Sequence, residues 1–258
     1  MRINKFWLGM GSAVLSLLVL GDAMGQELTG TVQWAQRVEL GTPQSGIVVD
    51  VPVKAGEMVK KGQLLLQLES RALQARVRRA EAAQTKAKKE RDEAQRELDR
   101  AKELYERTLL SNHDLEQAKI AYSEANSRNQ AANAALVEAR LDLEQSAIHA
   151  PFEGVVLQRS AEVGQTVVSN LQSVPLITMA ATRQMRVQTD ATQAQLAKLA
   201  VGQSVTVESG GKRFKGTISL IGFEPAATNG EPRYPLQVLF MTEGEIIRVG
   251  QPAKVIIP

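Results

Sequence analysis

The sequence predicts an α+β multidomain protein, in which an antiparallel helical hairpin is inserted into a split β-sandwich and a strand-rich region follows. Three observations support this. Two segments share one spacing of proline, glycine and valine, and a long helix-forming stretch separates them. That stretch carries heptad repeats, which are typical of paired helices. The C-terminal residues form short apolar runs separated by turn residues, which is the pattern of strands.

The N-terminal residues 1–25 are predicted to be a signal peptide. Arg2 and Lys5 precede an apolar run from Phe6 to Leu20, and Ala23-Met24-Gly25 provides small residues for cleavage. The apolar run is short for a membrane span, which needs about 20 residues, so an uncleaved anchor is the alternative. The chain has no cysteine, which excludes disulfides and lipid attachment through an N-terminal cysteine. We expect export to the periplasm.

The repeated segments predict one small β unit in two halves. The spacings of 3, 10 and 3 residues occur first in Pro43, Gly46, Gly56 and Val59, and again in Pro151, Gly154, Gly164 and Val167. Neither half has enough apolar surface to form a core alone. We therefore expect them to pair into a two-layer sandwich, from which the residues between them project.

The residues between the halves predict two antiparallel helices. Residues 71–109 contain neither glycine nor proline and favour a helix, which would be about 58 Å long. One seam joins Val77, Gln84, Arg91, Leu98 and Tyr105 with Leu73, Ala80, Ala87, Ala94 and Ala101. The other joins Leu115, Tyr122, Asn129, Leu136 and Leu143 with Ala118, Ala125, Ala132 and Ala139. Alanine rows let two backbones approach closely, so the sequence predicts an antiparallel coiled coil. The polar seam residues would fix the register, unless Arg91 simply reaches outward.

The turn between the helices is a candidate docking surface. Ser111 and Asp114 fit a capping box at the start of the second helix. Leu104 lies off the seam, so we expect it to lack a partner inside the hairpin. Arg100, Leu104 and Ser111 are separated by 4 and 7 residues, and on a continuous helix they would share an outer stripe. The alternative is a solvated arginine, an isolated surface leucine and a helix cap.

These segments resemble the periplasmic adaptor proteins (membrane fusion, HlyD-like) of tripartite efflux and secretion systems. The resemblance rests on I-x-A-P-F-x-G from Ile148 to Gly154, on G-x-x-V-x-x-G-Q-x-L-x-x-L from Gly56 to Leu68, and on R-x3-L-x6-S from Arg100 to Ser111. It implies a lipoyl/biotinyl-like domain from residues 38–69 and 147–181, a hairpin from 70–146, and a β-barrel from 26–37 and 182–258. It also implies that Arg100, Leu104 and Ser111 contact a TolC-like outer-membrane channel.

The resemblance further implies the function of an adaptor. Such a protein links an inner-membrane transporter, of resistance-nodulation-division (RND) or ABC type, to an outer-membrane channel, and it assembles into a ring of six copies. Many adaptors continue beyond the barrel, whereas this sequence stops at Pro258, so we expect a minimal adaptor. The alternative is a periplasmic coiled-coil holdase chaperone. A lipoyl or biotin carrier is a third hypothesis, but the hairpin occupies the turn on which carriers place their lysine, so no cofactor is expected.

Composition argues against other classes of function. The net charge of +3 with interspersed signs and the 4% of aromatic residues do not favour nucleic-acid binding. The two histidines, His113 and His149, have no further ligands at metal spacing. No phosphate-binding loop or nucleophile motif is present, so we expect a protein that is not an enzyme.

Overall fold

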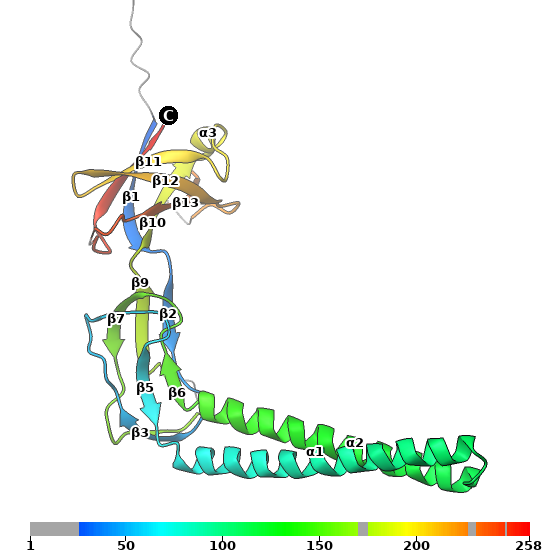
Figure 1. Cartoon of the computed structure of the whole chain (residues 1–258). Helices are drawn as coiled ribbons and strands as arrows, with labels where there is room; N and C mark the ends of the chain where they lie inside the picture. Colours follow the sequence, from blue (N-terminus) through cyan, green and yellow to red (C-terminus); the bar gives the residue numbers. More distant parts are fainter. Residues whose placement is uncertain (1–25, 170–174, 227–230, 246) are drawn as a thin grey trace, which may run out of the picture.

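The computed structural model describes residues 26–169, 175–226, 231–245 and 247–258. A barrel lies at one end, a sandwich in the middle, and a long hairpin leaves the sandwich at the end away from the barrel (Figure 1). The expected signal peptide, residues 1–25, lies outside the described residues. Of the helices in the described ranges, none is both long and apolar enough to cross a membrane.

The sandwich consists of two four-stranded sheets, whose orders are β2-β9-β7-β4 and β6-β5-β3-β8. Its core contains large aliphatic side chains without solvent exposure, among them Leu65, Val156 and Ile177. The strands of the first sheet are β2 (Arg37–Leu40), β9 (Ile177–Ala181), β7 (Gly154–Arg159) and β4 (Met58–Val59). Those of the second are β6 (Ala147–His149), β5 (Leu64–Leu68), β3 (Gly46–Asp50) and β8 (Thr166–Val167).

The two repeated segments pair with each other as expected. Strand β3 of the first segment pairs with β8 of the second, with Gly46 opposite Val167. Strand β7 of the second pairs with β4 of the first, with Gly154 opposite Val59. Because each half completes a sheet of the other, the residues between β5 and β6 have to leave the sandwich.

The turns that join the strands repeat the same symmetry. Gly56 N donates to Val156 O over 2.8 Å, and Gly164 N donates to Val48 O over 2.8 Å. Both glycines have a positive φ, +85° and +89°, which residues with a Cβ rarely adopt. Gly56 and Gly164 are therefore explained by turn geometry, and each turn is held by the opposite half.

The C-terminal strands and one N-terminal strand close into a six-stranded barrel of order β1-β10-β13-β12-β11-β14. As expected, the strand before the sandwich belongs to the barrel. The barrel region also contains a short helix, α3 (Gln193–Leu196), which begins with a capping box at Thr192. The barrel strands are β1 (Gln26–Trp34), β10 (Gln184–Thr192), β13 (Arg233–Met241), β12 (Lys212–Ile221), β11 (Ser204–Ser209) and β14 (Pro252–Ile257).

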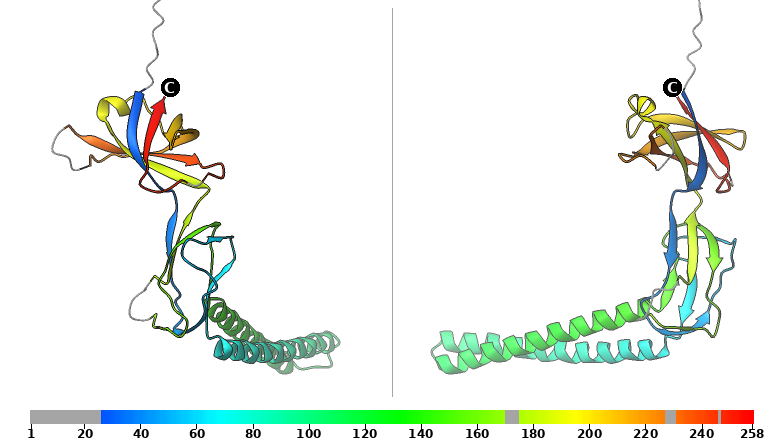
Figure 2. Two further views of the ribbon diagram at one scale, coloured as in Figure 1. Left: turned by 90° about the vertical axis from the view of Figure 1, so that its left-hand side faces the viewer. Right: turned by 180° about the vertical axis from the view of Figure 1, so that it is seen from behind.

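The hairpin consists of α1 (Arg71–Glu106) and α2 (Asn112–Glu144), and α1 is about 54 Å long. The helices lie side by side as far as the tip in two further views (Figure 2). Arg140 Nη2 lies 2.8 Å from Glu81 Oε1 and Arg76 Nη1 lies 3.0 Å from Asp142 Oδ2, which sets the antiparallel register. The seam residues are buried or half-buried, with the exception of Tyr105, which is exposed. The seam prediction is wrong for Tyr105, which lies in the last turn of α1, where the hairpin ends.

Two polar residues lie at one level of the seam. Counting from the Glu81–Arg140 pair places Arg91 beside Asn129. The Arg91 guanidinium reaches outward to Asp92 Oδ1 over 2.9 Å. Arg91 Nε and Asn129 Oδ1 are buried and have no hydrogen-bond partner among the described residues. Arg91 therefore reaches outward with the end of its guanidinium, but its Nε stays buried. This level of the seam contains a buried donor and a buried acceptor that make no hydrogen bond.

Candidate functional site

The base of the hairpin is fastened to the sandwich. Asp142 in α2 accepts a hydrogen bond from Gln44 Nε2 over 3.0 Å and pairs with Arg76 of α1. Thr42 Oγ1 donates to Gln145 O over 2.6 Å. Since Gln44 and Thr42 belong to the sandwich, one carboxylate connects it with both helices. The direction in which the hairpin points is thus set by hydrogen bonds as well as by chain connectivity.

A local ion pair also lies where the chain passes from β5 into α1. Arg71 donates two hydrogen bonds to the Glu69 carboxylate, over 3.0 Å and 2.8 Å. The side-chain hydrogen bond from Arg71 lowers the pKa of Glu69, and that from Glu69 raises the pKa of Arg71. Arg71 is exposed and Glu69 is partly exposed, so this pair contributes to the geometry of the first turn more than to stability.

The tip is a turn of defined geometry. Helix α1 ends at Glu106, and Thr108 has a positive φ of 57°, which is uncommon for a residue other than glycine. Leu109 N donates to Leu104 O over 2.9 Å. Ser111 Oγ accepts from Asp114 N over 3.2 Å and donates to Asp114 Oδ2 over 2.6 Å, so Ser111 caps α2 as expected.

The three predicted site residues are at the tip, but not on one stripe. Arg100 and Leu104 are on α1, four residues apart, whereas α1 ends before Ser111 and the chain reverses. Arg100 is exposed and binds Glu97 through Nη1, over 2.8 Å and 3.0 Å. The premise of a continuous helix is therefore wrong for Ser111, which approaches the tip from α2.

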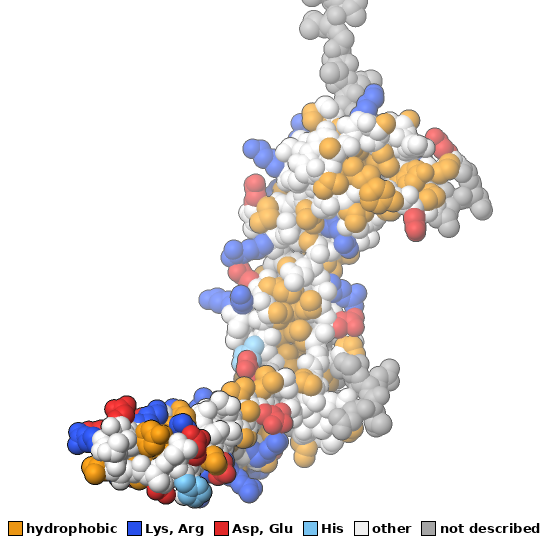
Figure 3. Space-filling view, turned by 90° about the vertical axis from the view of Figure 1, so that its right-hand side faces the viewer, with side chains coloured by type: hydrophobic (Ala, Val, Ile, Leu, Met, Phe, Trp, Pro, Cys, Tyr) orange, Lys and Arg blue, Asp and Glu red, His pale blue; other side chains and the backbone are white. Residues whose placement is uncertain are grey.

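Leu104 is half-buried, and not the exposed side chain that was expected. It flanks the seam, and the alanine rows bring the helices close enough to shield such flanking positions. The apolar surface at the tip comes instead from Tyr105 and from Leu109, which is 71% exposed. A view onto the end of the hairpin shows hydrophobic side chains among charged ones (Figure 3). The signal for Leu109 was its position in the turn, beyond the last seam residue.

The described residues show little that could perform chemistry. They contain no group of three His, Asp or Glu side chains suited to a metal ion. His113 lies at the tip, where its Nε2 is 2.9 Å from Gln117 Nε2. His149 is exposed in β6. What the tip offers is a surface for contact: an aromatic ring, a leucine, and a rim of charges that are already paired.

Comparison with known proteins agrees with this architecture. The macrolide export protein MacA of Yersinia pestis is 27% identical over 244 residues, covering 88% of this chain and 66% of MacA. The nodulation protein NolF of Rhizobium meliloti is 28% identical over 245 residues, covering 93% of this chain and 65% of NolF. The chain therefore spans just under two thirds of the length of these relatives.

Solved structures share the fold. The membrane fusion protein Spr0693 of Streptococcus pneumoniae R6 aligns with a TM-score of 0.66 at 20% identity, covering 90% of this chain and 98% of Spr0693. A MacA–MexA chimera that contains the α-hairpin domain of Pseudomonas aeruginosa MexA aligns with a TM-score of 0.63 at 23% identity, covering 91% and 82%. Residues 36–177, which contain the hairpin and the sandwich up to the start of β9, match the CzcB-like, barrel-sandwich hybrid domain family. The chain is a member of this family of barrel-sandwich proteins.

Proposed function

We propose that this protein is a periplasmic adaptor that links an inner-membrane transporter, of RND or ABC type, to an outer-membrane channel for efflux or secretion. The observation that carries the proposal is the long hairpin, fastened at its base by Asp142 and ending in an apolar tip. A long, stiff hairpin with a contact surface at its end is suited to bridging two partner proteins. The relatives are named for macrolide export and for multidrug resistance, which supports the same role.

The hairpin tip is the proposed contact with the channel. Arg100, Leu104 and Ser111 remain part of it, and Leu109 adds the most exposed apolar side chain there. Leu109→Asp and Arg100→Asp should abolish export in cells and leave helix content unchanged, because both side chains are exposed. Lys88→Asp, an exposed change in the middle of α1, is the control. Export that persists in both tip variants would refute the contact.

A holdase chaperone is less well supported. Such a protein needs an apolar inner surface that is free for unfolded clients, whereas the seam of this hairpin is closed within one chain, with Leu98, Leu115 and Ala125 buried. We infer a coiled coil that serves as a stiff element and not as a clamp.

The outer edge of α2 suggests how copies of the hairpin assemble. Its residues at alternating steps of three and four are uncharged and exposed, and thus form a second heptad stripe: Ile120, Ser123, Ser127, Gln130, Ala134, Val137 and Leu141. Val137 is 66% exposed. Exposed aliphatic side chains at heptad spacing are typical of a helix that packs against another.

The outer edge of α1 is complementary near the base. Ala72, Ala75 and Ala82 are exposed there, with the exposed Arg79 between Ala75 and Ala82. The Glu81–Arg140 pair places Ala82 level with the Val137–Leu141 region of α2. The charged upper part of this edge pairs within α1, for instance Arg96 with Glu93 and Arg100 with Glu97. We therefore infer that the α2 edge of one copy packs on the α1 edge of the next, a heterologous contact of the kind from which the proposed ring is built.

Engineered cysteines test this contact cleanly, because the chain has none of its own. Ala82→Cys with Val137→Cys places thiols on opposite edges of one hairpin, where they cannot reach each other. Oxidation should give a ladder of covalent oligomers that ends at the size of the ring. Either single variant should give no more than dimers. Absence of a ladder would reject the contact between hairpin edges. It would not bear on the adaptor role, which the export assay of the tip variants tests.

A further inference from the structure

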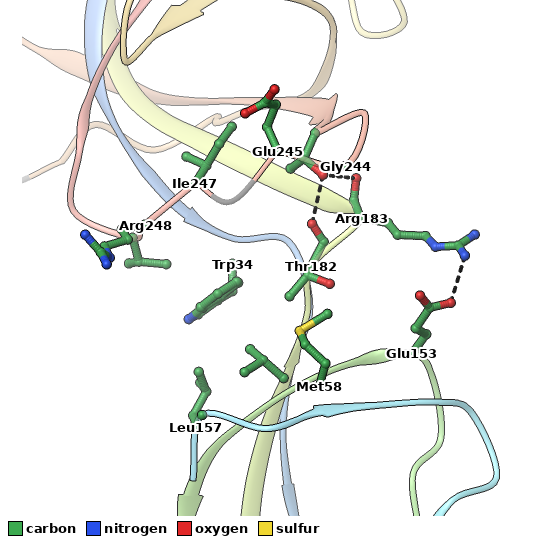
Figure 4. A pocket seen from close by; sticks show the side chains of 14 residues that line it. Trp34, Met58, Glu153, Leu157, Thr182, Arg183, Gly244, Glu245, Ile247 and Arg248 are labelled. Carbon is green, nitrogen blue, oxygen red and sulfur yellow. Dashed lines mark hydrogen bonds and ion pairs between the residues drawn. The ribbon is translucent and has the colours of Figure 1, made fainter.

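A cleft of about 820 Å3 lies between the sandwich and the barrel. Met58 in β4 and Leu157 in β7 form its sandwich wall, and Ile247 and Val249 in the β13–β14 loop form its barrel wall. Trp34, at the end of β1, lies between Ile247 and Leu157 (Figure 4). A mostly apolar cleft of this volume is of the size that binds drug-sized molecules.

The charges around the cleft do not cancel. Arg183 Nη2 binds Glu153 Oε2 over 2.8 Å at one end. Glu245 is bound by Lys212 Nζ over 2.5 Å. Arg248 lies at the end opposite Arg183 (Figure 4), and among the described residues it has no ion-pair partner. One positive charge therefore stands uncompensated beside apolar walls and an indole ring.

We propose that this cleft binds a small amphiphilic anion, whose apolar part packs on Trp34 and whose negative group pairs with Arg248. A cation is disfavoured because both carboxylates of the cleft, Glu153 and Glu245, are already neutralised by their own partners. An uncharged apolar ligand would leave Arg248 without a partner. Arginine is well suited to carboxylate, sulfonate or phosphate groups because its guanidinium presents a planar pair of donors.

Binding in this cleft also affects how the two domains are held. The barrel and the sandwich are connected by residues 35–36 and by Thr182 and Arg183, between β9 and β10. Thr242 of the barrel binds this second connection, with its N 3.0 Å from Arg183 O. A ligand that contacts both walls binds only one separation of them, so it stabilises that arrangement of the domains.

Two matched fluorescent probes test the proposal on the full-length protein. Anilinonaphthalene sulfonate carries an aromatic group and one negative charge, and N-phenylnaphthylamine has the same aromatic rings without the charge. Arg248 is exposed, so Arg248→Gln should weaken sulfonate binding about fivefold, the upper range for an exposed charge pair, and should not change binding of the neutral probe. Arg128→Gln, an exposed change on α2 far from the cleft, is the control and should alter neither.

The walls are tested separately. Met58→Gln together with Val249→Asn removes apolar surface from both sides, and both side chains are exposed, so folding should be unaffected. This variant should weaken binding of both probes about tenfold, and Trp34→Phe should remove the energy transfer from Trp34 to the bound probe. The proposal is overturned if neither probe binds, if Arg248→Gln weakens both probes equally or neither, or if the wall variant leaves both affinities unchanged.

Discussion

The sandwich and the hairpin are stabilised in different ways, although one is inserted into the other. The sandwich buries large side chains completely, such as Leu65 and Val156, between strands that are distant in sequence. The hairpin has few buried side chains, many of them alanine, and its contacts join only two neighbouring helices. The sandwich therefore depends on long-range packing, whereas the hairpin depends on helix propensity and a narrow seam. Substitutions that remove the same number of atoms should therefore change the free energy of unfolding more in the sandwich than in the hairpin.

The largest effect is expected where the halves of the sandwich meet. A Cβ on Gly154 would lie 2.1 Å from Ala180 O, whereas one on Gly46 would lie 3.5 Å from Leu68 Cδ1. Gly154→Ala should reduce the free energy of unfolding by about 3 kcal/mol or more, because the backbone of β9 has to move. Gly46→Ala should change it by less than about 1 kcal/mol. Chemical denaturation measures both, and equal effects would show that the two copies are not distinguished by packing.

A pair of leucines compares the two cores. Leu65→Ala in the sandwich should cost about 3 kcal/mol, while Leu98→Ala in the hairpin should cost about 1.5 kcal/mol, because alanine favours the helix and leaves a smaller cavity. Hydrogen exchange should show that Leu98→Ala accelerates exchange only in α1 and α2. Faster exchange in β5 and β7 of this variant would mean that the two parts unfold together.

The polar level of the seam should limit hairpin stability. Replacing Arg91 and Asn129 together with leucine removes the unfilled donor and acceptor, which should stabilise the hairpin by about 1–2 kcal/mol. Gln84→Leu is the matched control, since Gln84 is half-buried in the seam but has no unfilled buried atom. Thermal unfolding followed by circular dichroism measures the change, and an equal gain at Gln84 would assign it to hydrophobicity alone.

The smallest effect concerns the cap of α2. Ser111→Ala should reduce stability by about 1 kcal/mol, and Ser111→Asp should retain it, because aspartate also accepts the hydrogen bond from Asp114 N. If Ser111→Ala unfolds at the same temperature as the unchanged protein, the cap contributes nothing to stability. Export distinguishes the two roles of Ser111. If Ser111→Asp keeps the cap but loses export, Ser111 contacts the channel; if it keeps both, Ser111 acts only as the cap.

Much of the fold was predictable because its signals are local or repeated. The glycines at 46, 56, 154 and 164 identified two halves that pair, and the heptads identified the hairpin. The seam prediction failed at Tyr105, in the last turn of α1. A heptad repeat identifies the face of a helix that can pack, but not how far the partner helix covers that face.

The tip was harder to predict, because it depends on where α1 stops. The spacing of Arg100, Leu104 and Ser111 placed them on one stripe, but the left-handed Thr108 reverses the chain between them. The cleft beside Trp34 gave no sequence signal at all, since its lining residues come from five separate segments. Surfaces built from distant segments need the tertiary structure.

The most direct test of the account is a cross-link from the hairpin tip in intact cells. Leu109→Cys provides a unique thiol on the most exposed apolar residue of the turn, and Lys88→Cys provides one on the side of the arm. A bifunctional reagent should join the tip thiol to an integral outer-membrane protein, and the Lys88→Cys variant should not give this product. If the tip cross-links only to a spread of unfolded clients or to other copies of this chain, the adaptor account is contradicted.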